Sequence, residues 1–84
     1  MKLHPNEQRI LRYLLEKGYA THAELRAHFL PMSPTLVDLY LVRLMEKGFI
    51  GEVIGGKIRP TELAQRIKNK LPKVPVHELV IPGR

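Results

Sequence analysis

The chain has 84 residues, of which 44% are hydrophobic, and this length is enough for one compact domain but too short to enclose a deep substrate pocket. It contains no cysteine, which excludes disulfides and thiolate metal sites and favours a reducing, cytoplasmic environment. We find no run of about 18 apolar residues and no signal-peptide pattern, so we expect no membrane segment. These features argue against an enzyme and against a membrane protein.

The formal net charge of +6 is concentrated in the last third of the chain. Residues 1–56 carry seven Lys or Arg against six acidic residues, whereas residues 57–84 carry seven against two. A localised basic region attracts polyanions, of which nucleic acid is the most common. The charge alone is also compatible with a basic tail that keeps the protein soluble.

A first helix is predicted over residues 5–17, because apolar residues recur there at helical spacing. Pro5 suits its first turn, and Gly18 suits the position just past its end. The predicted inward face consists of four residues, Ile10, Leu11, Leu14 and Leu15.

A second, short helix is predicted from Thr21, which together with Glu24 has the spacing of a capping box. We expect it to end near Leu30, because Pro31 cannot extend a helix without the loss of a hydrogen bond. Its predicted inward face consists of Leu25 and Phe29.

A third helix is predicted over residues 33–47, since Ser33 directly before Pro34 is a favoured pairing of N-cap and first helical residue. Gly48 ends it. At about 100° per residue, Leu41 and Leu44 fall close to Val37, and Tyr40 and Met45 flank them. These five residues are predicted to form the buried stripe.

After this helix the pattern changes to two β-prone runs, 49–54 and 57–59, which are separated by a pair of glycines. A glycine pair supplies the backbone angles of a tight turn, so the runs predict a β-hairpin that ends at Pro60. Thr61 can then cap a fourth helix. The apolar positions of that helix are Leu63, Ala64, Ile67 and Leu71.

The end of the chain is predicted to form an extended arm. Three prolines interrupt an apolar segment from Pro72 onward, so the segment is too rich in proline for a helix. We expect it to pack on its own domain or on a second copy. The chain is therefore divided into a domain over 1–71 and a Pro-rich arm over 72–84.

The order of helix, helix, helix, hairpin and helix resembles the winged helix-turn-helix family, the fold of many bacterial and archaeal repressors. The resemblance covers about residues 5–71 and depends on T-H-A-E-L at 21–25, S-P-T-L-V at 33–37, the later leucines Leu41 and Leu44, and E-K-G-F-I at 46–50. It implies a mostly α-helical α+β domain with a three-helix core, a wing and a C-terminal helix.

The resemblance also implies a function, namely sequence-specific binding of double-stranded DNA by a transcriptional regulator such as a repressor. In that family the third helix, here 33–47, enters the major groove, and the wing, here 51–60, contacts the DNA backbone. Residues of this helix that would face the bases are Thr35, Leu36, Leu39, Tyr40 and Arg43. Lys57 and Arg59 would contact DNA from the wing, and backbone amides near Ser33 and Thr35 would be available to a phosphate.

We expect this regulator to be a cytoplasmic, nucleoid-associated homodimer, because one such module offers few base contacts and specific sites usually need two half-sites. The dimer interface, or seam, is predicted to consist of the arm over 72–84 together with the first and fourth helices.

Two alternatives use the same fold. The third helix presents Leu36, Leu39 and Val42 where polar side chains usually face bases, so this surface could instead dock a protein in a larger assembly. The other alternative is an accessory protein that binds nucleic acid without sequence preference.

No other chemistry is indicated. His22 and His28 lie about 240° apart around a helix and cannot share a metal ion from one face, so we interpret the four histidines, at positions 4, 22, 28 and 77, as surface or capping residues. Acidic residues such as Glu7 and Glu24 are interpreted as caps or solvent-facing partners of cations. We expect no catalytic site, metal or cofactor.

The three tyrosines are expected to pack in the core rather than stack on bases, because they do not alternate with basic residues along a strand. Among Tyr13, Tyr19 and Tyr40, only Tyr40 is expected at an edge where it could also touch a partner.

Overall fold

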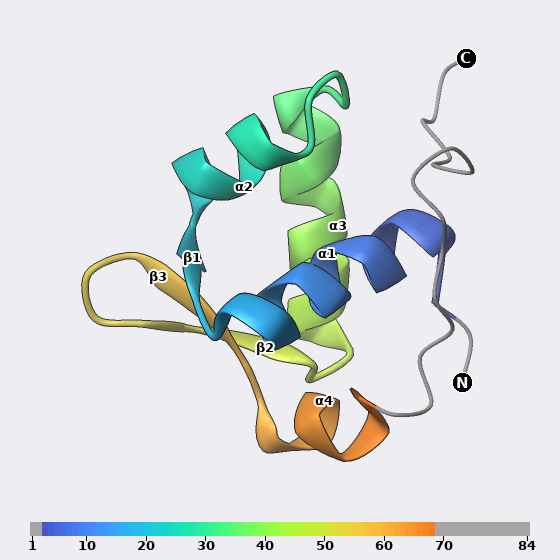
Figure 1. Cartoon of the computed structure of the whole chain (residues 1–84), viewed down its shortest axis with the longest axis vertical. Coiled ribbons are helices and arrows are strands. Elements are labelled where there is room, and N and C mark those ends of the chain that lie inside the picture. The colour runs from blue at the N-terminus through green and yellow to red at the C-terminus, as the bar shows by residue number, and fades with distance from the viewer. Residues whose placement is uncertain (1–2, 69–84) are drawn as a thin grey trace.

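The computed structural model describes residues 3–68, which form a small α+β domain of four α-helices and one three-stranded antiparallel sheet (Figure 1). The elements are α1 (Pro5–Lys17), β1 (Ala20–Thr21), α2 (His22–His28), α3 (Pro34–Glu46), β2 (Ile50–Val53), β3 (Lys57–Pro60) and α4 (Glu62–Ile67). The predicted order of helices and hairpin is confirmed, and β1 is an addition to it. The arm predicted over 72–84 and the predicted helical position Leu71 lie outside the described residues.

Helix α1 has the ends that its sequence predicts. Pro5 is its first residue, and the imidazole Nδ1 of His4 accepts a hydrogen bond from the amide of Asn6 at 3.0 Å. In return, Glu7 accepts one from the amide of His4 at 2.8 Å. At the other end Gly18 adopts φ 94°, a left-handed backbone that glycine takes at little steric cost. The interpretation of His4 as a capping residue is therefore confirmed.

The capping box of α2 is confirmed as well. The Thr21 hydroxyl accepts a hydrogen bond from the amide of Glu24, and the amide of Thr21 donates one to the Glu24 carboxylate. The helix ends at His28, two residues before the predicted end near Leu30. Helix α3 begins after Ser33, as predicted, although the Ser33 side chain makes no capping hydrogen bond.

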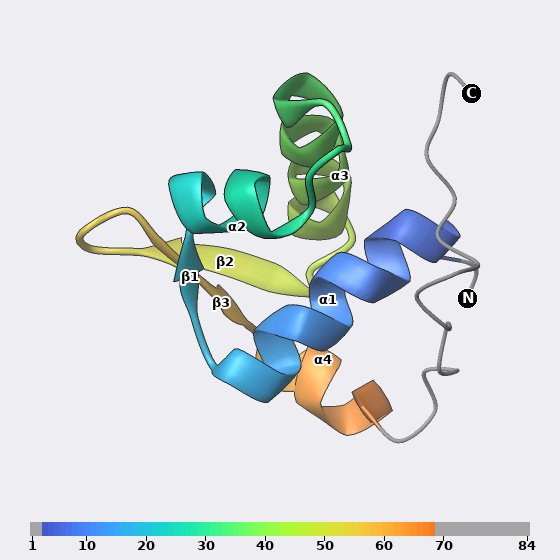
Figure 2. The same ribbon diagram turned by 45° about the horizontal axis from the view of Figure 1, so that its top comes forward.

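Strand β3 lies in the middle of the sheet, in the order β1-β3-β2. The predicted hairpin of β2 and β3 is confirmed, and its two turn glycines, Gly55 and Gly56, both have positive φ. On its other side, β3 pairs with β1 through Ala20 and Ile58, which are both fully buried. Figures 1 and 2 show the hairpin extending away from the helices.

The core lies between the helices and the inner face of the sheet. Its members are Ile10, Leu11, Leu14, Leu15, Ala20, Leu25, Phe29, Met32, Val37, Tyr40, Leu41, Leu44, Phe49, Ile50, Ile58 and Ala64. The predicted inward faces of the first three helices are thus confirmed. Of the apolar positions of the six-residue helix α4, Ala64 is buried and Ile67 packs against the core, whereas Leu63 is exposed. No helix within residues 3–68 has the length and apolar character needed to cross a bilayer.

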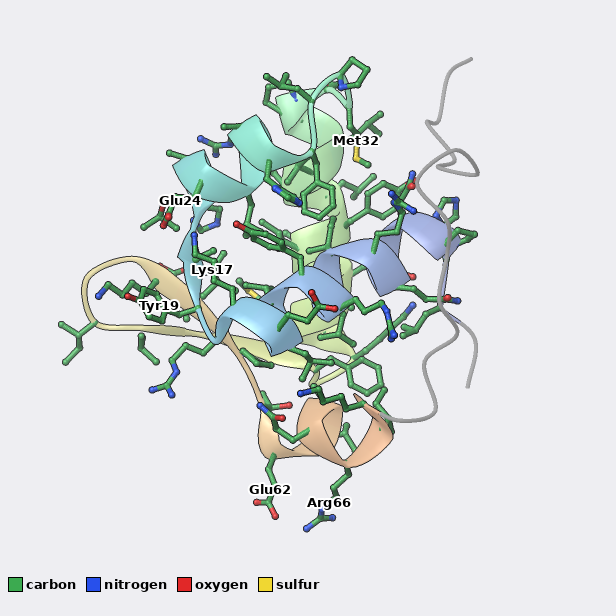
Figure 3. All side chains as sticks on the ribbon, viewed as in Figure 1. Lys17, Tyr19, Glu24, Met32, Glu62 and Arg66 are labelled. Atoms are coloured by element: carbon green, nitrogen blue, oxygen red, sulfur yellow. The ribbon has the colours of Figure 1, made fainter. Side chains whose placement is uncertain are left out.

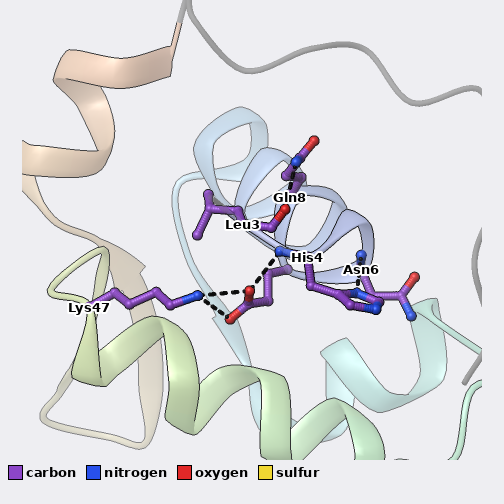
Figure 4. A network of polar contacts seen from close by, with 6 residues as sticks. Leu3, His4, Asn6, Gln8 and Lys47 are labelled. Atoms are coloured by element: carbon purple, nitrogen blue, oxygen red, sulfur yellow. Dashed lines mark hydrogen bonds and ion pairs between the residues drawn. The ribbon is translucent and has the colours of Figure 1, made fainter. Parts of the chain in front are cut away.

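A buried ion pair joins the start of α1 to the end of α3 (Figure 4). The ammonium of Lys47 lies 2.9 Å and 3.1 Å from the two carboxylate oxygens of Glu7, forty positions earlier in the chain. The Glu7 side chain is only 1% exposed, whereas that of Lys47 is 38% exposed. Glu7 therefore acts both as the predicted helix cap and as a link between two helices.

The capping carboxylate of α2 gives a prediction for acid stability. Hydrogen bonds from the Lys17 ammonium and from the Thr21 backbone amide lower the pKa of Glu24 to about 2. Because this pKa lies below the ordinary value of 4.5, the stabilisation is complete above that value and is lost as the pH falls toward 2. We expect the free energy of unfolding of Glu24→Gln to fall less between neutral and acid pH than that of the original chain, because the variant has no carboxylate to protonate at this position.

Urea unfolding measured at several pH values between about 6 and about 3 checks this. The variant should keep the acid-dependent loss that comes from Asp38, whose pKa is lowered by the Arg26 guanidinium. Parallel pH profiles for the variant and the original chain would contradict the assignment.

Candidate nucleic-acid interface

The outer side of α3 is uncovered by the described part of the chain. At about 100° per residue, Thr35, Leu39, Val42 and Glu46 fall within a sector of about 60° around the helix. All four are exposed, including the apolar side chains of Leu39 at 43% and Val42 at 51%. Figure 2 shows α2 beside α3 and the hairpin at a distance from the upper end of α3. We call these four residues together with Arg43 the α3 outer surface.

The residues predicted to face DNA bases differ in exposure. Thr35, Leu39 and Arg43 are exposed, as a DNA contact requires. Leu36 is half-buried and packs against the core, so only part of its side chain is accessible.

The prediction for Tyr40 as a base contact is wrong. Its side chain is only 4% exposed, and its ring stacks on that of His4 with 5.1 Å between the ring centroids. The reason is its position on the helix, three residues after Val37 and four before Leu44, which places it on the buried stripe.

The α3 outer surface carries little net charge. Arg43 and Glu46 are exposed, and neither makes an ion pair within residues 3–68. Asp38, at the edge of this surface, is held by Arg26 of α2 through two hydrogen bonds of 3.1 Å and 2.8 Å. The Arg26 guanidinium lowers the pKa of Asp38, which in turn raises the pKa of Arg26. This bidentate contact neutralises the charge of Asp38 and holds α2 against α3.

Ser33 and Thr35, whose backbone amides were predicted to be available to a phosphate, are both exposed at the start of α3. Pro34 between them has no amide hydrogen.

The sheet presents its two cations on one face. Lys57 and Arg59 lie on either side of the fully buried Ile58, so both point away from the core. Both are exposed, as predicted for wing contacts, and neither makes an ion pair within the described residues.

Tyr19, labelled in Figure 3, contributes an exposed aromatic ring beside Lys57, which the sequence did not predict. Its side chain is 45% exposed, and the ammonium of Lys57 lies 4.6 Å from the ring centroid. The prediction that Tyr19 packs in the core is wrong because Ala20, the next residue, points inward in β1 and turns Tyr19 to the opposite side. The sequence carries no signal for this exposure, because Tyr19 follows Gly18 and lies beyond the helical stripe of α1.

Tyr13 and His28 pack against other rings of the domain. Tyr13 stacks on His28 with 3.9 Å between ring centroids and contacts Phe29 edge to face. No group of three or more potential metal ligands occurs among the residues that the structure describes. His77, which was interpreted as a surface or capping residue, lies outside the described residues.

No family model, curated protein or solved structure matches this chain. The function is therefore argued from two features of the described residues, the α3 outer surface and the basic face of the sheet.

Proposed function

We propose that this chain is a winged helix-turn-helix domain that binds double-stranded DNA as a transcriptional regulator, with α3 in the major groove and the β2–β3 hairpin on the DNA backbone. The observation that carries the proposal is the uncovered outer side of a 13-residue helix, preceded by a short helix and followed by a hairpin with two exposed cations. A major groove about 12 Å wide admits one α-helix. The resemblance in sequence supports the same fold.

The residue types on α3 suggest how a base sequence is recognised. Arg43 is the residue there best suited to hydrogen-bond guanine or a phosphate, and Thr35 carries a hydroxyl that can bond to several bases. Leu39 and Val42 can contact the methyl groups of thymine. We therefore expect a binding site that contains thymines opposite the middle of α3.

Replacement of Arg43 by Gln should lower the affinity for a selected duplex by about tenfold or more and broaden the base preference, because a charged bidentate contact is lost. Selection from a pool of randomised duplexes, followed by titration of the selected sequence, measures both effects. Arg66→Gln is the control for charge, since it removes the same charge from an exposed position of α4. Because the fourth helix belongs to the predicted dimer interface, the dimer fraction of this variant is compared with that of the original chain. Equal losses for the two variants would mean that net charge alone, rather than α3, determines binding.

A second candidate function is protein docking through the same helix. It is favoured by the exposure of Leu39 and Val42, which form an apolar strip on a helix with few charges. Salt titration separates the hypotheses. A steep fall of affinity with salt and a strong preference for one sequence support a regulator, whereas a steep fall without preference supports a non-specific accessory protein. Absence of duplex binding at low salt would leave the protein-docking module.

We also propose that the regulator acts as a homodimer in the cytoplasm, with the arm over 72–84 in the seam. Deletion of residues 72–84 should reduce the dimer fraction, because the apolar side chains of the arm are then missing. Sedimentation velocity at matched concentrations measures this fraction. A dimer of undiminished stability would exclude the arm from the seam.

A further inference from the structure

We propose that the outer face of the three-stranded sheet is a second DNA-contacting surface, on which Tyr19 positions the Lys57 ammonium for a backbone phosphate of duplex DNA. This inference rests on the proposed function and extends it from the hairpin to β1.

The register of the sheet determines which side chains share this face. Ile58 is buried and pairs with Ala20 on one side and with Glu52 on the other, so these three positions belong to the inner face. The outer face then carries the alternate positions: Thr21 from β1, Gly51 and Val53 from β2, and Lys57 and Arg59 from β3. None of these is acidic, and the acidic residue of the hairpin, Glu52, belongs to the opposite face. The Glu24 carboxylate, which accepts a hydrogen bond from the Thr21 amide, is paired with the Lys17 ammonium at 2.9 Å. The outer face is therefore positively charged and complementary to phosphate.

Tyr19 extends this face by one position beyond β1. It lies diagonally from Lys57 across the β1–β3 ladder, a separation that a long side chain and an aromatic ring can bridge. The observed 4.6 Å between the ammonium and the ring centroid is a cation–π contact. Such a contact restricts the flexible lysine side chain but leaves its charge and the remaining sides of the ammonium accessible to an anion.

This restriction matters for binding because a free lysine loses rotamer freedom when a phosphate immobilises it. The ring of Tyr19 removes part of that freedom before DNA binds. Tyr19 is thus a positioning residue that acts through Lys57, and its hydroxyl is not required.

The test compares Tyr19→Ala, Tyr19→Phe and Lys57→Gln in the full chain, with binding to one duplex measured over a series of salt concentrations. Lys57→Gln should reduce the slope of log affinity against log salt by about one, because one phosphate contact is lost. Tyr19→Ala should weaken binding about two- to fivefold at an almost unchanged slope, the loss expected from one exposed cation–π contact. Tyr19→Phe keeps the ring and should bind like the original chain. In the Lys57→Gln background, Tyr19→Ala should have no further effect.

Arg66→Gln again serves as the control for charge, and thermal unfolding shows whether each variant is folded. The inference is overturned if Lys57→Gln leaves the salt slope unchanged, or if Tyr19→Ala weakens binding equally with and without Lys57. If Arg43→Gln weakens binding while the Lys57 and Tyr19 variants bind like the original chain, α3 is retained as the DNA-binding element and this second surface is rejected. A folded original chain that binds no duplex at low salt would reject both.

Discussion

Replacement of Lys47 by Met should lower the free energy of unfolding by about 2–3 kcal/mol, because it leaves the Glu7 carboxylate buried without its cation. The Glu7 side chain is 1% exposed, and its remaining hydrogen bond is the one from the amide of His4. Fully buried pairs lose about 3–5 kcal/mol when one partner is removed. We expect a smaller value here because the Lys47 side chain is 38% exposed, so water lies close to the pair. Urea unfolding measures the loss.

The matched control is Lys17→Met, which removes the ammonium that pairs with Glu24 at the same distance of 2.9 Å. Lys17 is as exposed as Lys47, at 38%, but Glu24 is 44% exposed against 1% for Glu7, so water can reach the Glu24 carboxylate in place of the lost partner and the loss should be clearly smaller. Equal losses for the two variants would show that burial of Glu7 contributes nothing to its pairing with Lys47.

Replacement of Leu41 by Ala should lower the free energy of unfolding by about 3 kcal/mol, whereas Leu39→Ala, two residues away on α3, should cost less than about 1 kcal/mol. The same atoms are removed in both variants. Leu41 is 1% exposed and its truncation leaves a cavity between α3 and the core, while Leu39 is 43% exposed and its truncation leaves none. For a domain of this size, a loss of 3 kcal/mol lowers Tm by more than about 10 °C.

The same two variants should have the opposite order in DNA binding. Leu39→Ala removes a side chain of the α3 outer surface and should weaken binding to the selected duplex at temperatures where both variants are folded. Leu41→Ala should bind almost normally under those conditions. A large loss of stability in Leu39→Ala would mean that the outer side of α3 is covered in the full chain, and α3 would then have no surface for DNA.

The elements of this fold were predictable where a short local pattern determines them. The proline at the start of α1, the Thr21 capping box, the Ser33-Pro34 step and the glycine pair of the hairpin each satisfy or terminate backbone hydrogen bonds within a few residues. Strand β1 was not predictable in this way. It has two residues, too few for an alternating pattern, and it exists because β3 offers it an edge to pair with.

Among the candidate site residues, Lys57, Arg59 and Arg43 are exposed as predicted because charged side chains on strand and helix surfaces remain in water. The prediction that Tyr19 packs in the core is wrong, whereas the same prediction for Tyr40 is confirmed and only its assignment as a base contact is wrong. Tyr40 lies at the boundary of a helical stripe, where the neighbouring element decides its burial, and here His4 of a different segment covers it. Tyr19 lies in a connection, where periodicity gives no information, and pairing of the next two residues with β3 turns it outward.

The sequence by itself determined where the first three helices begin, which of their faces are apolar, where the hairpin turns, and that the basic residues gather toward the C-terminal end. Only the tertiary structure decided that Glu7 pairs with Lys47 and that Tyr19 is exposed. It also placed Lys57 against that ring. The physical reason is range: caps, turns and apolar stripes arise between residues three or four positions apart, whereas these contacts join side chains that only chain packing brings together.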